Sequence, residues 1–314
     1  MQLLIPYAFV TDDPRCAQAA ARLQLPVLEQ LLRRLNLTRT DTVPPPALAP
    51  PHEHALAQAL GLPVRDGGIP WAAFEQARGG GDPGTAGWAW VTPAHWQIGA
   101  DRILMTDPAA LQLPEDESRA LLQAMEPWFT QDGITLQFDT ADRWLARGEV
   151  FAELASASLD RVIDTDLAPW LPATAALRRL QNEMQMLLYT HPINDARSAR
   201  GLPTVNSFWI SGSGALPAAF TGAMPEASQP VIAHALRGPA LHGDWAGWTQ
   251  AWQQIDQGAC RELAAALERG AAPVELVLCS ERDALHFTPA AGGWRERLQR
   301  RFRRTTLKDF IGPS

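Results

Sequence analysis

The stretch over residues 182–214 constrains the fold most, because a helical pattern, a proline and a strand pattern follow one another within it. Apolar residues at helical spacing predict an amphipathic helix that ends at about Thr190, since Pro192 cannot continue a helix without losing a hydrogen bond. The β-rich run 205–210 then predicts a strand. This succession indicates an α/β fold.

Between the predicted helix and the predicted strand lies a turn with its own signals. We expect Asn194 to cap a short helical turn over residues 195–200, because its side chain can accept from a free backbone amide. Gly201 would supply the left-handed residue that ends this turn. A Gly-Ser-Gly sequence follows the predicted strand directly, at the end where open α/β sheets bind ligands.

The candidate ligand-binding residues combine two cations with amide and glycine positions. Arg197 and Arg200 are three residues apart and would project from neighbouring positions of a helical turn. Two guanidinium groups near the backbone amides of a glycine-rich strand end would suit a phosphate or a carboxylate. The structural alternative is that the asparagines bond backbone groups, Arg197 pairs with an acid and the glycines permit turns. The candidates are Asn194, Arg197, Arg200, Asn206, Gly212, Ser213 and Gly214.

The pattern N-x-x-R-x-x-x-G-L-P-x-x-N-S-F-W-x-x-G-x-G over residues 194–214 resembles the central motif of archaeal-type cofactor-independent phosphoglycerate mutases. It is most similar to the bacterial branch of phosphoglycerate mutase-like or RpfE-type regulatory proteins. The resemblance implies the α/β fold of the alkaline-phosphatase superfamily, with a mixed or mostly parallel sheet flanked by helices.

The resemblance does not extend to the metal motifs of the mutases, which take many ligands from C-terminal Asp-x-x-Gly-His and Asp-His motifs. The sequence contains no Gly-His, His-Asp or Asp-His dipeptide. We therefore predict a regulatory pseudoenzyme that needs no cofactor. It would keep the anion pocket, and its ligand would be a phosphorylated or carboxylate small molecule.

Two other functions stay open. One is an active, divergent phosphoglycerate mutase or phosphatase that holds Mn or Zn through Asp12, Asp101, His191 and Asp244. Asp12 follows the first predicted strand, where the superfamily has a metal-binding aspartate, but Asp12 or Asp13 can equally cap the next helix. The other function is a protein-interaction module that binds a protein partner through a tryptophan-rich surface or a basic tail.

Composition limits the partners. The formal net charge of -7 argues against nucleic-acid binding, which needs a basic face. Three cysteines without C-x-x-C spacing indicate a reducing compartment, and we expect a cytoplasmic protein. No apolar run approaches the roughly 20 residues that span a bilayer, so no membrane association is expected.

The remaining patterns predict a single α/β domain over residues 1–314. Within it we expect a proline-rich surface connection at 38–51 and a basic C-terminal helix at 294–304. One long helix should begin after Asp244 and continue to about residue 267, with a stripe of tryptophans. Two hairpins are predicted, at 134–146 and 274–287.

Overall fold

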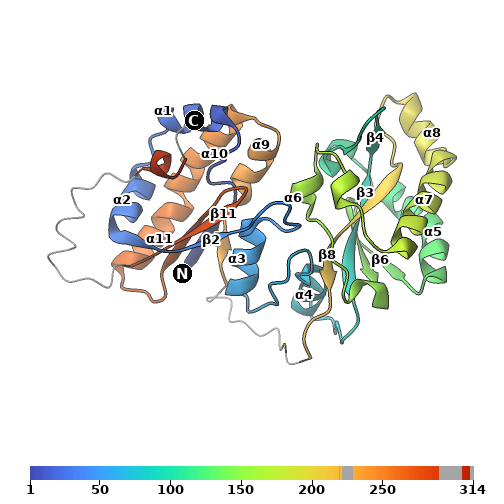
Figure 1. Cartoon of the computed structure of the whole chain (residues 1–314), viewed down its shortest axis with the longest axis horizontal. Coiled ribbons are helices and arrows are strands. Elements are labelled where there is room, and N and C mark those ends of the chain that lie inside the picture. The colour runs from blue at the N-terminus through green and yellow to red at the C-terminus, as the bar shows by residue number, and fades with distance from the viewer. Residues whose placement is uncertain (219, 221–228, 290–305, 312–314) are drawn as a thin grey trace. The chain divides into compact units, whose positions relative to one another are not determined.

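A computed structural model describes residues 1–218, 220, 229–289 and 306–311 (Figure 1). The chain forms two compact units, where the sequence predicted one domain. Unit 1 comprises Met1–Pro46, Pro50–Gly61 and Ala223–Ser314, and unit 2 comprises Ala47–Ala49 and Leu62–Gly222. The physical reason is that each unit has its own large cluster of buried apolar side chains, a property that local patterns do not reveal.

Unit 1 contains a mixed five-stranded sheet in the order β2-β11-β10-β1-β9. Strand β1 (Gln2–Ile5) pairs in parallel with β10 (Glu275–Cys279) and β9 (Val231–Ile232). Strand β11 (Asp283–Pro289) runs antiparallel to both β10 and β2 (Leu35–Thr42). The hairpin predicted at 274–287 is therefore confirmed.

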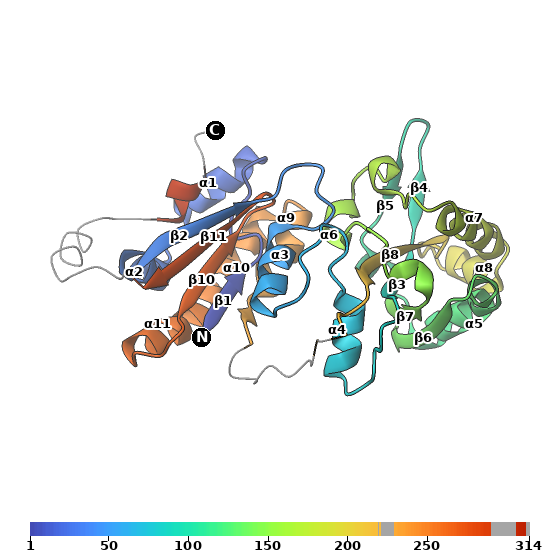
Figure 2. The ribbon, with the colours of Figure 1, turned by 60° about the horizontal axis from the view of Figure 1, so that its bottom comes forward.

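Successive side chains of a strand point to opposite sides of a sheet, and β1 carries apolar side chains on both sides. Helices cover both faces of the sheet and bury these side chains. Leu3 and Ile5 belong to the larger cluster with four helices, whereas Leu4 packs in a smaller cluster with Ala55 of α3. The α/β class with a mixed sheet flanked by helices is confirmed (Figure 2). The helices are α1 (Pro14–Arg22), α2 (Pro26–Arg34), α3 (Pro51–Ala59), α9 (Arg237–Leu241), α10 (Trp245–Gln257) and α11 (Ala259–Glu268).

Four sequence predictions for unit 1 are corrected, refined or fall outside the described residues. Residues 38–42 are not a surface connection, because they belong to β2 and pair with β11. The predicted long helix does begin after its cap Asp244, but Gly258 interrupts it between α10 and α11. Trp248 and Trp252 are fully buried, so they form core and not an interaction surface. The basic helix predicted at 294–304 lies outside the described residues.

Unit 2 contains an antiparallel four-stranded sheet in the order β6-β7-β3-β8. Its strands are β6 (Thr135–Thr140), β7 (Arg143–Arg147), β3 (Trp88–Ala94) and β8 (Ser207–Gly214), with a separate hairpin of β4 (Trp96–Ile98) and β5 (Ile103–Met105). The hairpin predicted at 134–146 is formed by β6 and β7. Leucines and methionines of α5 and α7 pack against this sheet in one buried cluster. The helices are α4 (Trp71–Arg78), α5 (Glu115–Gln131), α6 (Leu159–Val162), α7 (Ala175–Tyr189) and α8 (Pro192–Ala199).

Among the described residues, none of the helices combines the length and the apolar character that crossing a membrane requires.

Candidate functional site

The central motif lies in unit 2, where α7, α8 and β8 follow one another. Helix α7 ends at Tyr189, as the proline predicts, and Gly201 has the expected left-handed φ of 70°. The prediction that Asn194 is a helix cap is wrong. His191 caps α8 instead, since its ring accepts from the amide of Ile193 at 3.3 Å, and Pro192 occupies the first helical position.

Asn194 has a buried structural role inside α8. Its side-chain nitrogen donates to the carbonyls of Leu188 at 2.8 Å and Val205 at 2.7 Å. Its side-chain oxygen accepts from the amide of Val205 at 2.9 Å. One amide group therefore joins the end of α7 to the segment that leads into β8, and it satisfies three backbone groups.

Arg197 and Arg200 share one carboxylate. The guanidinium of Arg197 is completely buried and donates to Glu117 at 2.6 Å, to the carbonyl of Pro203 at 2.8 Å and to the carbonyl of Leu111. Arg200, which is half exposed, donates to the other oxygen of Glu117. All three nitrogens of the Arg197 guanidinium thus have protein acceptors, and the group has no surface on which an anion could bind.

The two arginines stabilise the negative charge of the Glu117 carboxylate. Burial raises the pKa of its carboxyl, but the hydrogen bonds from Arg197 and Arg200 together lower it more, so the pKa lies below the ordinary 4.5. Glu117 belongs to α5, far from the motif in sequence, and no local pattern identifies it as the partner of two arginines.

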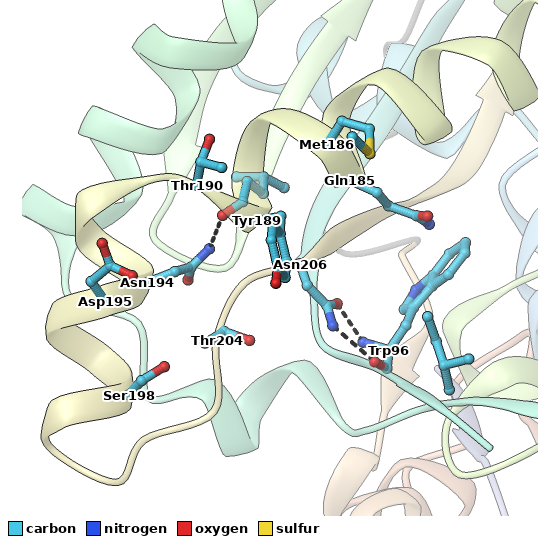
Figure 3. A pocket seen from close by; sticks show the side chains of 12 residues that line it. Trp96, Gln185, Met186, Tyr189, Thr190, Asn194, Asp195, Ser198, Thr204 and Asn206 are labelled. Atoms are coloured by element: carbon cyan, nitrogen blue, oxygen red, sulfur yellow. Dashed lines mark hydrogen bonds between the residues drawn. The ribbon is translucent and has the colours of Figure 1, made fainter.

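The side-chain amide of Asn206 also forms hydrogen bonds with backbone groups. Its side-chain oxygen accepts from the amide of Trp96 at 2.7 Å, and its nitrogen donates to the carbonyl of the same residue at 2.8 Å (Figure 3). This two-point contact fixes the start of β4 next to the segment that enters β8.

The Gly-Ser-Gly sequence lies inside β8 and not after it. A Cβ on Gly212, whose φ is 61°, would lie 2.7 Å from the ring of Trp90, and a Cβ on Gly214 would lie 2.9 Å from Pro70. Ser213 is fully buried, and its hydroxyl donates to a backbone carbonyl at 2.8 Å. These three residues allow close packing, and the strand end expected to bind an anion is not formed here.

The four candidate metal ligands are divided between the two units. In unit 1, Asp12 pairs with Arg282 at 2.7 Å, and Asp244 caps α10 by accepting from a backbone amide at 2.9 Å. In unit 2, Asp101 lies between β4 and β5, and His191 caps α8. Over the ranges that the structure describes, no three His, Cys, Asp or Glu side chains gather as a metal site.

A cavity of about 820 Å³ opens in unit 2 beside the motif (Figure 3). Its apolar lining has an inner wall and an exposed rim. The inner wall consists of Trp96 and Leu188, which are buried. The rim consists of Ile98, Met186 and Tyr189, whose exposed fractions of 75, 73 and 81% are the highest among the exposed large apolar side chains of the described residues.

Among the described residues, the polar lining of this cavity has one charged side chain, Asp195, and includes no arginine, lysine or histidine. Two of the seven residues predicted to bind a ligand, Asn194 and Asn206, belong to it. Sequence reasoning missed Trp96, because it comes from a hairpin about 100 residues before the motif and nothing local connects the two. The polar lining residues are Gln185, Thr190, Asn194, Asp195, Ser198, Thr204 and Asn206.

Comparison with known proteins gives similarity to solved structures only. No family model and no curated protein matches this sequence. The cofactor-independent phosphoglycerate mutase from Thermoplasma acidophilum DSM 1728 is 12% identical, with a TM-score of 0.35, over 93% of this chain and 91% of that one. The PH0037 protein from Pyrococcus horikoshii is also 12% identical, with a TM-score of 0.47, over 95% and 92% of the two chains.

Proposed function

We propose that this chain is a non-catalytic regulatory protein that binds a small organic molecule in the cavity of unit 2. The observation that carries the proposal is the cavity itself. Its volume of about 820 Å³ falls in the range of small-molecule sites, roughly 300–1,000 Å³, and its lining combines apolar walls with a few polar groups. A regulatory role agrees with the RpfE-type resemblance of the motif.

The lining supports a neutral or positively charged ligand better than an anion. A phosphate or carboxylate in the cavity would meet the carboxylate of Asp195 and no cationic side chain of the lining. The arginines expected to bind an anion are paired with Glu117. The geometry thus favours another ligand class than the phosphorylated or carboxylate molecule that the motif suggests.

The chemistry of the lining supports binding without catalysis. Nucleophilic catalysis needs a nucleophile within hydrogen-bonding reach of a base that a third group orients. The described lining offers the hydroxyls of Ser198, Thr190, Thr204 and Tyr189. Nδ1 of His95 lies 3.4 Å from the hydroxyl of Thr204, but it donates to the carbonyl of the same residue at 2.8 Å, so this nitrogen carries a proton and cannot take one from the hydroxyl.

The test fills the cavity and screens ligands by charge. Ser198→Trp places a large side chain in the lining, and Ala120→Trp adds the same side chain on the exposed surface of α5 as a control. Saturation-transfer NMR with a library of neutral, cationic and anionic fragments, including phosphate esters, should give neutral and cationic hits. Those hits should disappear in Ser198→Trp and persist in Ala120→Trp. Hits that survive Ser198→Trp, or a set dominated by phosphate esters, would contradict the proposal.

A protein ligand is a second candidate, because the exposed rim residues Ile98, Met186 and Tyr189 surround the same cavity. Exposed apolar side chains gathered at one place are typical of interaction sites. Replacing Met186 and Tyr189 with serine should then abolish capture of a protein partner while fragments still bind at the inner wall. Unchanged capture would eliminate this candidate.

A further inference from the structure

Strand β2 forms an open edge of the sheet in unit 1. It is the first strand in the order β2-β11-β10-β1-β9, and among the described residues only β11 pairs with it (Figure 2). Residues 37–40 and 42 of the strand are exposed. An exposed strand edge carries free backbone donors and acceptors, so it is a template on which another strand can pair.

The free backbone groups of this edge belong to Thr40 and Thr42. In an antiparallel pair, alternate residues direct both N–H and C=O at the partner strand. The amide of Val43 donates to the carbonyl of Arg282 at 2.8 Å, so the groups of Val43 and, by alternation, those of Asp41 face β11. The groups of Thr40 and Thr42 therefore point away from the sheet and have no partner among the described residues.

The charged side chains of this edge are arranged for pairing with an identical strand. Arg39 and Asp41 flank Thr40 on one face of β2, with their side chains 52 and 30% exposed. If two copies of the strand run antiparallel with Thr40 opposite Thr40, each Arg39 lies opposite Asp41 of the other copy. These would be non-hydrogen-bonded pairs, in which the Cα atoms are about 4.5 Å apart and side chains are closest. Opposite charges at such positions stabilise the pairing.

The sequence of β2 allows one such register. A twofold axis through Thr42 or Thr38 would place both charged side chains opposite valine, proline or leucine. A register shift also interrupts the ladder beyond Arg39, and residues 44–46, which are all proline, follow the strand and lack the N–H that pairing needs. The regular edge is thus short and centred near Thr40.

We propose that β2 pairs with β2 of a second copy of this chain, so that the two five-stranded sheets join across a twofold axis at Thr40. The two Thr40 residues exchange both backbone hydrogen bonds, and two ion pairs between Arg39 and Asp41 flank them. The dimer is weak and reversible, because the paired edge is short and the net charge of -7 on each copy opposes association.

The first test removes one outward N–H. Sedimentation equilibrium from micromolar to millimolar protein should show a reversible monomer–dimer equilibrium for the wild type. Thr40→Pro should be monomeric throughout, because proline lacks the N–H that pairs with the second copy and takes no donor from β11. Thr40→Val keeps the N–H and should dimerise as the wild type does. A dimer that persists in Thr40→Pro would use another surface and overturn the proposal.

The second test exchanges the charges and does not depend on proline. Arg39→Asp and Asp41→Arg should each weaken self-association about tenfold, since two attractive pairs become repulsive. An equimolar mixture of the two variants should form a heterodimer as strong as the wild-type dimer, because every pair is then opposite in charge. A mixture that associates no better than either variant alone would overturn the proposal. A wild type that stays monomeric at millimolar concentration would also overturn it and leave the edge to a strand of another protein.

Discussion

The two faces of α8 carry polar residues in very different states. Asn194 and Arg197, three residues apart, are buried, and every polar atom of their side-chain heads has a protein partner, although Asn194 also borders the cavity. Asp195 and Ser198 have the same spacing one position later and line the cavity, where no described side chain bonds either of them. The face with Asn194 and Arg197, here called the closed face, joins neighbouring segments of unit 2. The face with Asp195 and Ser198, the open face, has side-chain donors and acceptors that no described side chain uses. A binding site is better recognised by that unused capacity than by a motif of charged residues.

The largest expected effect follows from removing the buried cation. Arg197→Ala removes one of the two cations that hold Glu117 and takes the guanidinium donor from two backbone carbonyls, so the free energy of unfolding should fall by about 3–5 kcal/mol in chemical denaturation. The matched control is Arg200→Ala, which removes an exposed cation from the same carboxylate and should cost less than about 1 kcal/mol. If Arg197→Ala kept full stability and abolished binding of phosphate esters, the closed face would be an anion site after all.

The adjacent residues Asn194 and Asp195 of α8 allow a second comparison of the two faces. Asn194→Ala removes the partners of three buried backbone groups and should lower the free energy of unfolding by about 2–3 kcal/mol. Asp195→Asn changes an exposed carboxylate near the helix start and should cost about 0.5 kcal/mol. Both values come from urea denaturation of the two variants beside the wild type. Equal losses would mean that the two faces do not differ in the way described.

The smallest expected effect is the pH dependence of the stability that Glu117 contributes through its ion pairs with Arg197 and Arg200. The pKa of Glu117 is below its ordinary 4.5 in the folded protein, so its ion pairs stabilise the fold fully above that value. This contribution should be lost as the pH falls below 4.5 and through the lower folded-state pKa. The stability difference between wild type and Glu117→Gln should therefore be constant above about pH 5.5 and shrink in acid. A difference that is flat down to pH 3 would show that Glu117 is not held ionised.

Local patterns predicted much of the secondary structure and little of the site. The stop of α7, the left-handed Gly201, the cap Asp244 and the two hairpins depend on residues close in sequence, and the structure confirms them. The ion pair between Arg197 and Glu117 depends on the packing of α5 against the motif, which no local pattern encodes.

The same limit explains the other differences. Asn194 was expected to cap a turn because asparagine favours that position, but the helix starts earlier, at Pro192, and places the residue inside. The division into two compact units follows from two buried clusters, which are a property of tertiary contacts and not of local patterns. The cavity combines the β4–β5 hairpin with α7 and α8, so Trp96 could be found only in three dimensions.

The most direct test of the open face is an NMR titration that observes Met186 and Arg197 in one sample. The protein has only six methionines, which makes the methyl resonance of Met186 assignable by substitution. Addition of 2-naphthamide should shift that methyl resonance and leave the Nε–H resonance of Arg197 unchanged, and 3-phosphoglycerate should shift neither. A saturable shift at Arg197 with 3-phosphoglycerate, without any response of Met186 to the amide, would contradict the account.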